Sequence, residues 1–146
     1  MNTIERAAPV DRTKARERRA RLTLALAALY NAACAVWTVM WPESFFDLMA
    51  LPQPTYPALW QCIGMMVGVF GLGYAYAAWR IDRATPFVAL GLLGKLFGPM
   101  GWISAVSSGE WPARTFMLVF FNDIIWWIPF TLTLACVIRY EFRRRV

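Results

Sequence analysis

The sequence predicts an all-α fold: an antiparallel bundle of four transmembrane helices with a short interfacial segment between the first two. Hydrophobic residues make up 59% of the 146 positions and charged residues 16%, a composition too apolar for an ordinary soluble domain. The apolar residues also gather into four runs of about the 20 residues that cross a bilayer as a helix, at 22–41, 58–79, 86–106 and 115–138. We therefore expect one transmembrane domain, residues 22–138, between two basic tails, residues 1–21 and 139–146.

The distribution of basic residues indicates how the helices are oriented. Lys and Arg cluster before the first run, between the second and third runs, and after the fourth. The other two connections contain Glu43, Asp47, Glu110 and a single basic residue, Arg114. Because cytoplasmic connections are enriched in Lys and Arg, both termini are predicted to be cytoplasmic. This topology accounts for the net charge of +6, and we expect membrane lipid rather than nucleic acid as a partner.

The first apolar run follows a basic stretch, as the apolar part of a signal peptide would, but it continues to Trp41 and is long enough to span a membrane. We therefore expect a retained helix that ends at Pro42. In the connection that follows, Ser44 is predicted to cap a short interfacial helix. The apolar residues of that helix are expected to enter the outer leaflet: Phe45, Phe46, Leu48 and Met49.

Glycines follow a helical spacing in the second and third runs. They repeat every three or four residues, which places the glycines of each run on one narrow helix face. Such stripes let membrane helices approach closely. Because the connection at residues 81–85 is short, we expect the two stripes to face each other. The predicted packing residues are Gly64, Gly68 and Gly71 in the second run, and Gly91, Gly94, Gly98 and Gly101 in the third.

Two charged residues interrupt the apolar runs: Lys95 in the third and Asp123 in the fourth. If residues 106–113 form the turn of a hairpin, each lies about ten residues from that turn and, at ~1.5 Å per residue, about 15 Å deep. A charge at the bilayer centre costs roughly 2.5–3.5 kcal/mol on insertion scales and is normally paired. The sequence therefore predicts a buried Lys95–Asp123 pair.

Other polar and aromatic residues are expected near this pair. Pro129 lacks a backbone donor and should leave the Ile125 carbonyl without its helical partner. Two interpretations of the pair stay open: buried charges can fix helix register, or they can mark a path for an ion, proton or ligand. The neighbouring tryptophans could likewise stack on a ligand or pack in the core. The predicted polar site comprises Lys95, Asp123, Asn122, Asn31, Trp126 and Trp127.

The residue inventory excludes several kinds of active site. The chain has no histidine, so neither histidine ligation of haem nor a catalytic imidazole is available. The three cysteines, Cys34, Cys62 and Cys136, all fall inside predicted helices and lack the spacing of metal ligands. We therefore predict no metal site and assign no catalytic residue, which makes an enzyme the less favoured class.

Several segments form a recognisable set. They are Tyr30-Asn31, Tyr56-Pro57-x-Leu59-Trp60-Gln61-Cys62-Ile63-Gly64-Met65, Gly71-x-Gly73-Tyr74, Gly91-Leu92-x-Gly94-Lys95-x-x-Gly98-Pro99-x-Gly101 and Asn122-Asp123-x-x-Trp126-Trp127-x-Pro129-Phe130. They resemble a family of small bacterial four-helix membrane proteins, some of which carry an alkyl hydroperoxide reductase label. More distantly, the chain is similar to the DoxX-like group, some of whose members are linked to quinol oxidation and oxidative stress. The resemblance covers roughly residues 30–132 and implies a four-helix protein of the bacterial cytoplasmic (inner) membrane.

Three functions follow from these observations. The first is a binding or transport protein, as a homo-oligomer or with a partner membrane protein, with a cavity at the polar site. The second is a DoxX-like accessory subunit that presents the site to a quinone headgroup; no other cofactor is implied. The third is a peroxidase, because Pro129-x-x-x-Thr133-x-x-Cys136 matches the peroxiredoxin spacing. We disfavour it, since apolar surroundings near a helix C-terminus oppose a thiolate and Arg139 compensates only in part.

Overall fold

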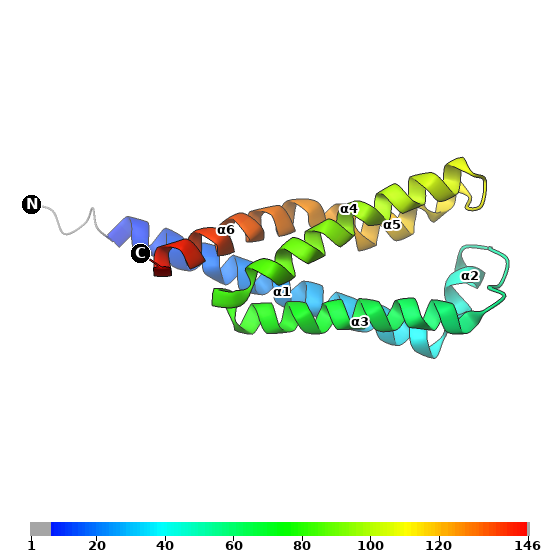
Figure 1. Ribbon diagram of the computed structural model, residues 1–146, viewed down its shortest axis with the longest axis horizontal. Coiled ribbons are helices and arrows are strands. Elements are labelled where there is room, and N and C mark those ends of the chain that lie inside the picture. Colours follow the sequence, from blue (N-terminus) through cyan, green and yellow to red (C-terminus); the bar gives the residue numbers. More distant parts are fainter. Residues whose placement is uncertain (1–6, 146) are drawn as a thin grey trace, which may run out of the picture.

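The computed structural model describes the backbone of residues 7–145 and the side chains of residues 13–143. Within that part every regular element is a helix, and Figure 1 shows them as one elongated bundle. Three spans are continuous: α1 (Ala7–Met40), α3 (Pro57–Trp79) and α4 (Thr85–Ser107). The fourth consists of η2 (Ala113–Thr115), α5 (Phe116–Asn122), η3 (Ile124–Trp126) and α6 (Trp127–Arg145). With the short α2 (Ser44–Leu48) and η1 (Ile81–Arg83), these elements confirm the predicted all-α four-helix bundle.

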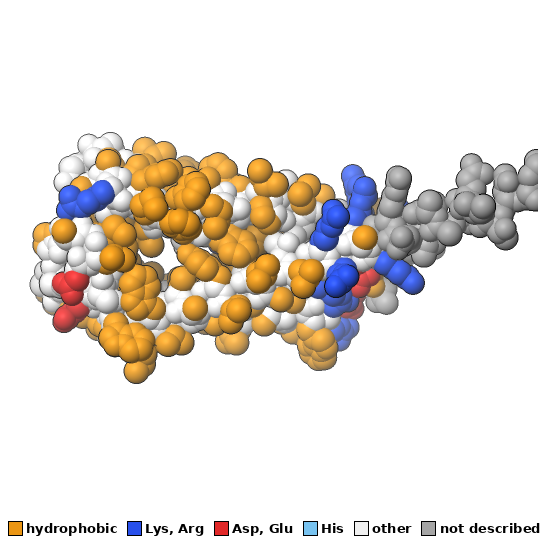
Figure 2. All heavy atoms as spheres, turned by 180° about the vertical axis from the view of Figure 1, so that it is seen from behind, with side chains coloured by type: hydrophobic (Ala, Val, Ile, Leu, Met, Phe, Trp, Pro, Cys, Tyr) orange, Lys and Arg blue, Asp and Glu red, His pale blue; other side chains and the backbone are white. Residues whose placement is uncertain are grey.

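Four helical stretches are long and apolar enough to cross a membrane: Thr13–Met40, Pro57–Trp79, Thr85–Ser107 and Ala113–Arg143. Their outward-facing side chains are large and apolar, such as Leu72 and Ile128, each 73% exposed. Apolar side chains cover the length of the bundle, while most Lys and Arg side chains gather at one end (Figure 2). A contiguous exposed apolar surface of this kind needs lipid to cover it. The chain is therefore a small multi-pass membrane protein.

The two ends of the bundle contain different elements of the chain. α1 begins and α6 ends at the terminal end, whereas α2 lies at the opposite end, the α2 end (Figure 1). Prolines set several helix boundaries, since Pro57 occupies the first turn of α3 and Pro86 that of α4. At the terminal end, Arg21 donates to the last carbonyls of α3, those of Ala78 and Trp79, at 2.6 and 2.9 Å. A cation at a helix C-terminus is favourable there.

The short helix α2 departs from its sequence-based expectation. Its N-cap residue is Glu43, which makes no capping side-chain bond, while the Ser44 hydroxyl donates to the Trp41 carbonyl at 2.6 Å. The expected Ser44 cap is therefore wrong. Phe45 also turns inward: it is 4% exposed and stacks on Trp60 with 5.1 Å between ring centroids. One face of α2 thus closes onto the bundle instead of entering lipid.

The three predicted packing glycines of α3, Gly64, Gly68 and Gly71, face α1, whereas Gly73 faces Phe87 of α4. A side chain at Gly64 would meet Thr38, and one at Gly68 would meet Ala35, both on α1. α1 and α3 accordingly form the most extensive helix contact of the molecule, and they lie side by side in Figure 1. The expectation that this stripe faces the third span was wrong. The reason is that α1 offers small and β-branched residues opposite each glycine, which permits the closer approach.

The glycines of α4 do not form one packing seam. Gly91 lies against the rings of Tyr74 and Phe130, and Gly98 lies against the Asp123 carboxylate. Gly94 and Gly101 have nothing within 4 Å of where a side chain would begin. The stripe therefore combines two close approaches with two open positions.

Candidate functional site at a break in the fourth span

The fourth span is interrupted halfway along its length. α5 ends at Asn122, and Asp123 follows with φ −124° and ψ −61°, outside the helical conformation. The chain continues as a single 3₁₀ turn before α6 begins at Trp127. The Trp126 N–H donates to the Asp123 carbonyl at 3.0 Å, so the Asn122 carbonyl loses the donor that a regular helix would supply. Non-helical backbone at membrane depth is tolerated where other groups satisfy it.

Side chains donate to two backbone carbonyls at the break. The Lys95 ammonium donates to the Asn122 carbonyl at 2.7 Å. The Trp126 indole donates to the Phe121 carbonyl at 3.1 Å. A lysine in the middle of α4 thus caps the C-terminal end of α5, where a positive charge is favoured.

The contact between the two spans is reciprocal. Pro99 lies four residues after Lys95 and has no N–H, so the Lys95 carbonyl also lacks its helical donor. The Trp127 indole supplies one at 2.9 Å. Each span therefore binds a carbonyl that the other cannot satisfy within its own helix. A proline four residues after the buried lysine is visible in the sequence. The predicted unsatisfied carbonyl was nevertheless the one four residues before Pro129.

Lys95 is surrounded by aromatic rings and protein backbone. It is 5% exposed, and its ammonium lies 5.5 Å from the ring centroids of both Trp126 and Phe130, within cation–π range. Ion pairs of 4.0 Å or less in the described part of the chain join Arg21 to Glu17 and Arg80 to Asp82. Lys95 thus reaches the break through backbone, and its charge interacts with Asp123 at longer range.

The Asp123 carboxylate occupies a space that glycine provides. Asp123 is 5% exposed, and the Asn122 amide donates to its Oδ1 at 3.0 Å. A side chain at Gly98 would collide with this carboxylate. The glycine therefore makes room for a buried acid rather than for a neighbouring helix.

Asn31 lies apart from the other predicted site residues. It is 5% exposed, and its amide donates to the Val67 carbonyl at 3.4 Å, within the contact between α1 and α3. Its neighbour Tyr30 faces the site instead, with its ring 5.6 Å from that of Trp126. The structure thus brings together Lys95, Asn122, Asp123, Trp126 and Trp127. Tyr30, Gly98, Pro99 and Phe130 also contribute to the site, although their sequence pattern did not place them in it.

A cavity of about 410 Å³, here called the aromatic cavity, extends from Asp123 toward the α2 end. Its deep part is lined by Tyr30, Cys34, Gly98, Asn122 and Asp123. Lys95 does not line it and lies behind the break. The wall toward the α2 end is aromatic, formed by Trp37, Phe45, Trp60, Trp102 and Trp111.

The α2 end of the aromatic cavity is held by one arginine. Arg114, in η2, donates to the carbonyls of Met49 and Ala50 at 2.7 and 2.8 Å. These carbonyls follow α2, so the bond joins the α1–α3 half of the molecule to the half that contains α4 and the fourth span. Phe45 on α2 is also 6.5 Å from Trp111, between ring centroids. Together they form a small closure over the aromatic cavity.

Comparison of the chain with family models, with curated proteins and with solved structures gave no match. The geometry of the break and of the aromatic cavity is therefore the basis for a functional proposal.

Proposed function

We propose that the chain is a small protein of the bacterial inner membrane, with both termini cytoplasmic, that binds an amphipathic small molecule in the aromatic cavity. The observation that supports this proposal is a buried carboxylate, Asp123, at the deep end of a cavity with aromatic walls. Its volume of about 410 Å³ lies within the ~300–1,000 Å³ of typical small-molecule sites.

The groups that line the aromatic cavity define the chemistry of the ligand. Asp123 accepts hydrogen bonds or balances a positive charge, and the Tyr30 hydroxyl can donate or accept. The surrounding indole and phenyl faces favour flat apolar groups and cations. A ligand with an apolar body and a cationic or hydrogen-bond-donating head fits this arrangement. Lys95 supports the site from behind, because its charge offsets that of Asp123 without entering the cavity.

The break in the fourth span supports a binding or transport role over a purely structural one. Interrupted helices at mid-membrane depth are the elements that build ligand sites in transporters. A closure that depends on Arg114 and α2 would let the ligand enter from the outer side. The core at the terminal end, which includes Leu24, Val88 and Phe130, each 0% exposed, blocks the opposite side.

A DoxX-like accessory role with a quinol is the second candidate, and one feature of the aromatic cavity favours it. Tyr30 and Asp123 line the same deep end and supply a donor and an acceptor for the oxygens of a quinol ring. A peroxidase is less well supported, because Cys136 lies in the interior of α6 rather than in its first turn, where a helix N-terminus favours a thiolate.

The binding proposal is tested with two probes of different chemistry. Purified protein in nanodiscs is titrated with benzyltrimethylammonium or with a short-chain quinol, and tryptophan fluorescence is followed. Ala105 lines the aromatic cavity, so Ala105→Phe should abolish the response. Ala89, on the same helix but exposed to lipid, provides the matched control Ala89→Phe. The preferred probe distinguishes the two candidates, and equal responses from both variants would refute binding in the cavity.

The proposed orientation of the protein in the membrane is tested separately. Reporter fusions at Val146 and within residues 52–56 should be active on the cytoplasmic and outer sides, respectively. This follows from the arginines at the terminal end and the acidic residues near α2. The reverse pattern would contradict the proposed topology.

A further inference from the structure

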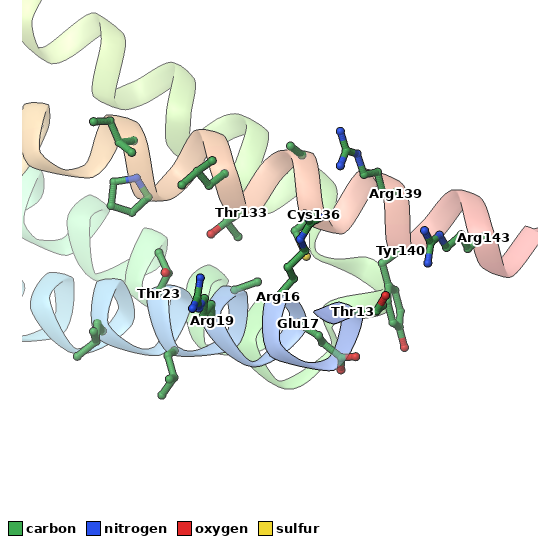
Figure 3. A pocket seen from close by; sticks show the side chains of 17 residues that line it. Thr13, Arg16, Glu17, Arg19, Thr23, Thr133, Cys136, Arg139, Tyr140 and Arg143 are labelled. Atoms are coloured by element: carbon green, nitrogen blue, oxygen red, sulfur yellow. The ribbon is translucent and has the colours of Figure 1, made fainter. Parts of the chain in front are cut away.

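A second hollow lies between α1 and α6, on the terminal-end side of the break at Asp123. This arginine groove has a volume of about 700 Å³. Its polar part is lined by Arg16, Arg19, Arg139 and Arg143, and its apolar part by Leu22, Leu26, Ile128 and Leu132. Figure 3 shows Arg16 and Arg19 extending from α1 toward the α6 residues Thr133 and Cys136.

Within the side chains that the structure describes, residues 13–143, the positive charge of the arginine groove is not balanced by acidic groups. Glu17 is the one acidic residue in its lining, and Arg21 already binds that carboxylate at 2.9 Å. Among the residues whose side chains the structure describes, none of the four groove arginines pairs with an acid within 4.0 Å. Clustered unpaired guanidinium groups are suited to a phosphate, which they can bind with paired hydrogen bonds.

The apolar part continues the groove toward the middle of the membrane. The four apolar side chains lie nearer the middle of the spans, and the four arginines lie nearer the terminal end. This order matches that of the acyl and headgroup regions in a leaflet. The hydroxyl-bearing residues Thr23 on α1 and Thr133 on α6 also line the groove (Figure 3). A ligand that matches this order has an anionic head and a long apolar tail.

We infer that the arginine groove binds one anionic phospholipid, with its phosphate at Arg16 and Arg19 and an acyl chain along Leu26 and Leu132. Charge complementarity selects an anionic lipid over a zwitterionic one, because the described lining of the groove contains four arginines and one acid, Glu17, which is already paired. The bound lipid bridges the first and last spans. This site is independent of the ligand proposed for the aromatic cavity.

The arginine groove also contains the residues of the peroxiredoxin-like spacing in the fourth span. Pro129, Thr133 and Cys136, which share the peroxiredoxin spacing, all line the arginine groove. Their spacing of four and three residues places them on one face of α6, the face that contacts the lipid. We assign these residues to lipid contact rather than to peroxide chemistry.

The test compares lipid retention by matched variants of the full chain. Protein is purified in mild detergent, exchanged into equal amounts of dioleoyl phosphatidylglycerol and dioleoyl phosphatidylcholine, and examined by native mass spectrometry. We expect one phosphatidylglycerol to be retained in preference to phosphatidylcholine. Arg16→Gln/Arg19→Gln should reduce that preference roughly tenfold, since each basic residue near an anionic lipid contributes substantially. Arg16→Lys/Arg19→Lys keeps the charge but not the paired hydrogen bonds of a guanidinium, so it should retain only part of the preference.

Lys14→Gln/Arg18→Gln is the matched control, because it removes the same charge from the same helix at positions outside the groove. It should keep the preference; an equal loss in both double variants would refute a defined site. Ala135→Trp fills the groove without changing charge and should also lose the lipid, whereas Ile138→Trp, outside the lining, should not. Displacement by free glycerol phosphate would assign the site to a soluble anion and overturn the lipid. Thermal unfolding in phosphatidylcholine alone verifies that each variant is folded.

Discussion

The two halves of the bundle are built differently, although the same four spans pass through both. At the terminal end, Leu24, Ala77, Val88, Phe130 and Val137 are each 0% exposed and fill the centre. Toward the α2 end the two helix pairs diverge (Figure 1). The space between them there contains the aromatic cavity. The boundary between a filled and a hollow half is the break at Asp123.

This difference shows how a short membrane protein can remain folded around a cavity. Packing rather than the hydrophobic effect holds membrane helices together, so a hollow half needs polar bonds to replace lost contacts. The bonds are those of Lys95 and Trp127 across the break, and of Arg114 at the α2 end. Substitutions at these residues should therefore affect the hollow half in order of how deeply each is buried.

Removing the Lys95 charge should have the largest effect. Lys95→Met leaves the buried Asn122 carbonyl without a donor, which costs ~1–3 kcal/mol, and the loss of the charge that compensates Asp123 adds to this cost. Lys95→Met/Asp123→Leu should recover only part of this stability, because the Asn122 carbonyl stays unsatisfied. Unfolding in mixed detergent measures each variant. Strictly additive losses would show that the two charges do not interact.

The double variant also separates the two interpretations of the charged pair. If the pair only fixes helix register, ligand retention should return together with stability. The proposed function instead requires that the double variant regains part of the stability and still fails to respond to the probes of the aromatic cavity, since the carboxylate is gone.

The glycines of α4 should respond in opposite directions to the same substitution. Gly98→Ala places a side chain onto the Asp123 carboxylate and should destabilise the protein by ~1–3 kcal/mol, as overpacking does. Gly94→Ala and Gly101→Ala meet open space and should be neutral or stabilising by up to ~1 kcal/mol, because alanine favours a helix. Thermal unfolding of the three variants in one detergent is the measurement. Equal destabilisation at all three positions would mean that the stripe is a uniform packing seam.

The Trp127 bond can be tested against the proline that makes it necessary. Trp127→Phe leaves the Lys95 carbonyl unsatisfied at a cost of ~1–3 kcal/mol. Pro99→Ala supplies the missing backbone donor, so Trp127→Phe should cost less in that background. A mutant cycle of four proteins gives the coupling energy. No coupling between the two substitutions would mean that the indole bond does not compensate for Pro99.

The sequence predicted the spans and the buried charges because these depend on local quantities: run length, hydropathy and the rarity of charge in apolar segments. The group that Lys95 binds, the Asn122 carbonyl, depends instead on where the fourth span leaves the helical conformation. Neither Asp123 nor Pro129 alone specifies that position in the sequence. Asn31 shares the depth of Asp123 but faces α3, since helix rotation depends on packing against Val67 and Gly71. The depth of a residue in the membrane could be estimated by counting along the chain, whereas the neighbouring helix that its side chain faces could not.

The smallest expected effect on stability belongs to Arg114, at the exposed end of the hollow half. Arg114→Gln removes two hydrogen bonds to backbone carbonyls at a solvent-exposed site, each worth ~0.5–1.5 kcal/mol at most. Its effect on access to the aromatic cavity should be larger, because these bonds join the α1–α3 pair to the pair formed by α4 and the fourth span at the mouth of the cavity. Cys34 lines that cavity, so in a Cys62→Ala/Cys136→Ala background its alkylation by a small maleimide reports the opening. The rate should rise severalfold in Arg114→Gln and stay unchanged in Glu110→Gln, a nearby exposed control. An unchanged rate in Arg114→Gln would show that α2 closes the cavity through Phe45 and its aromatic neighbours alone.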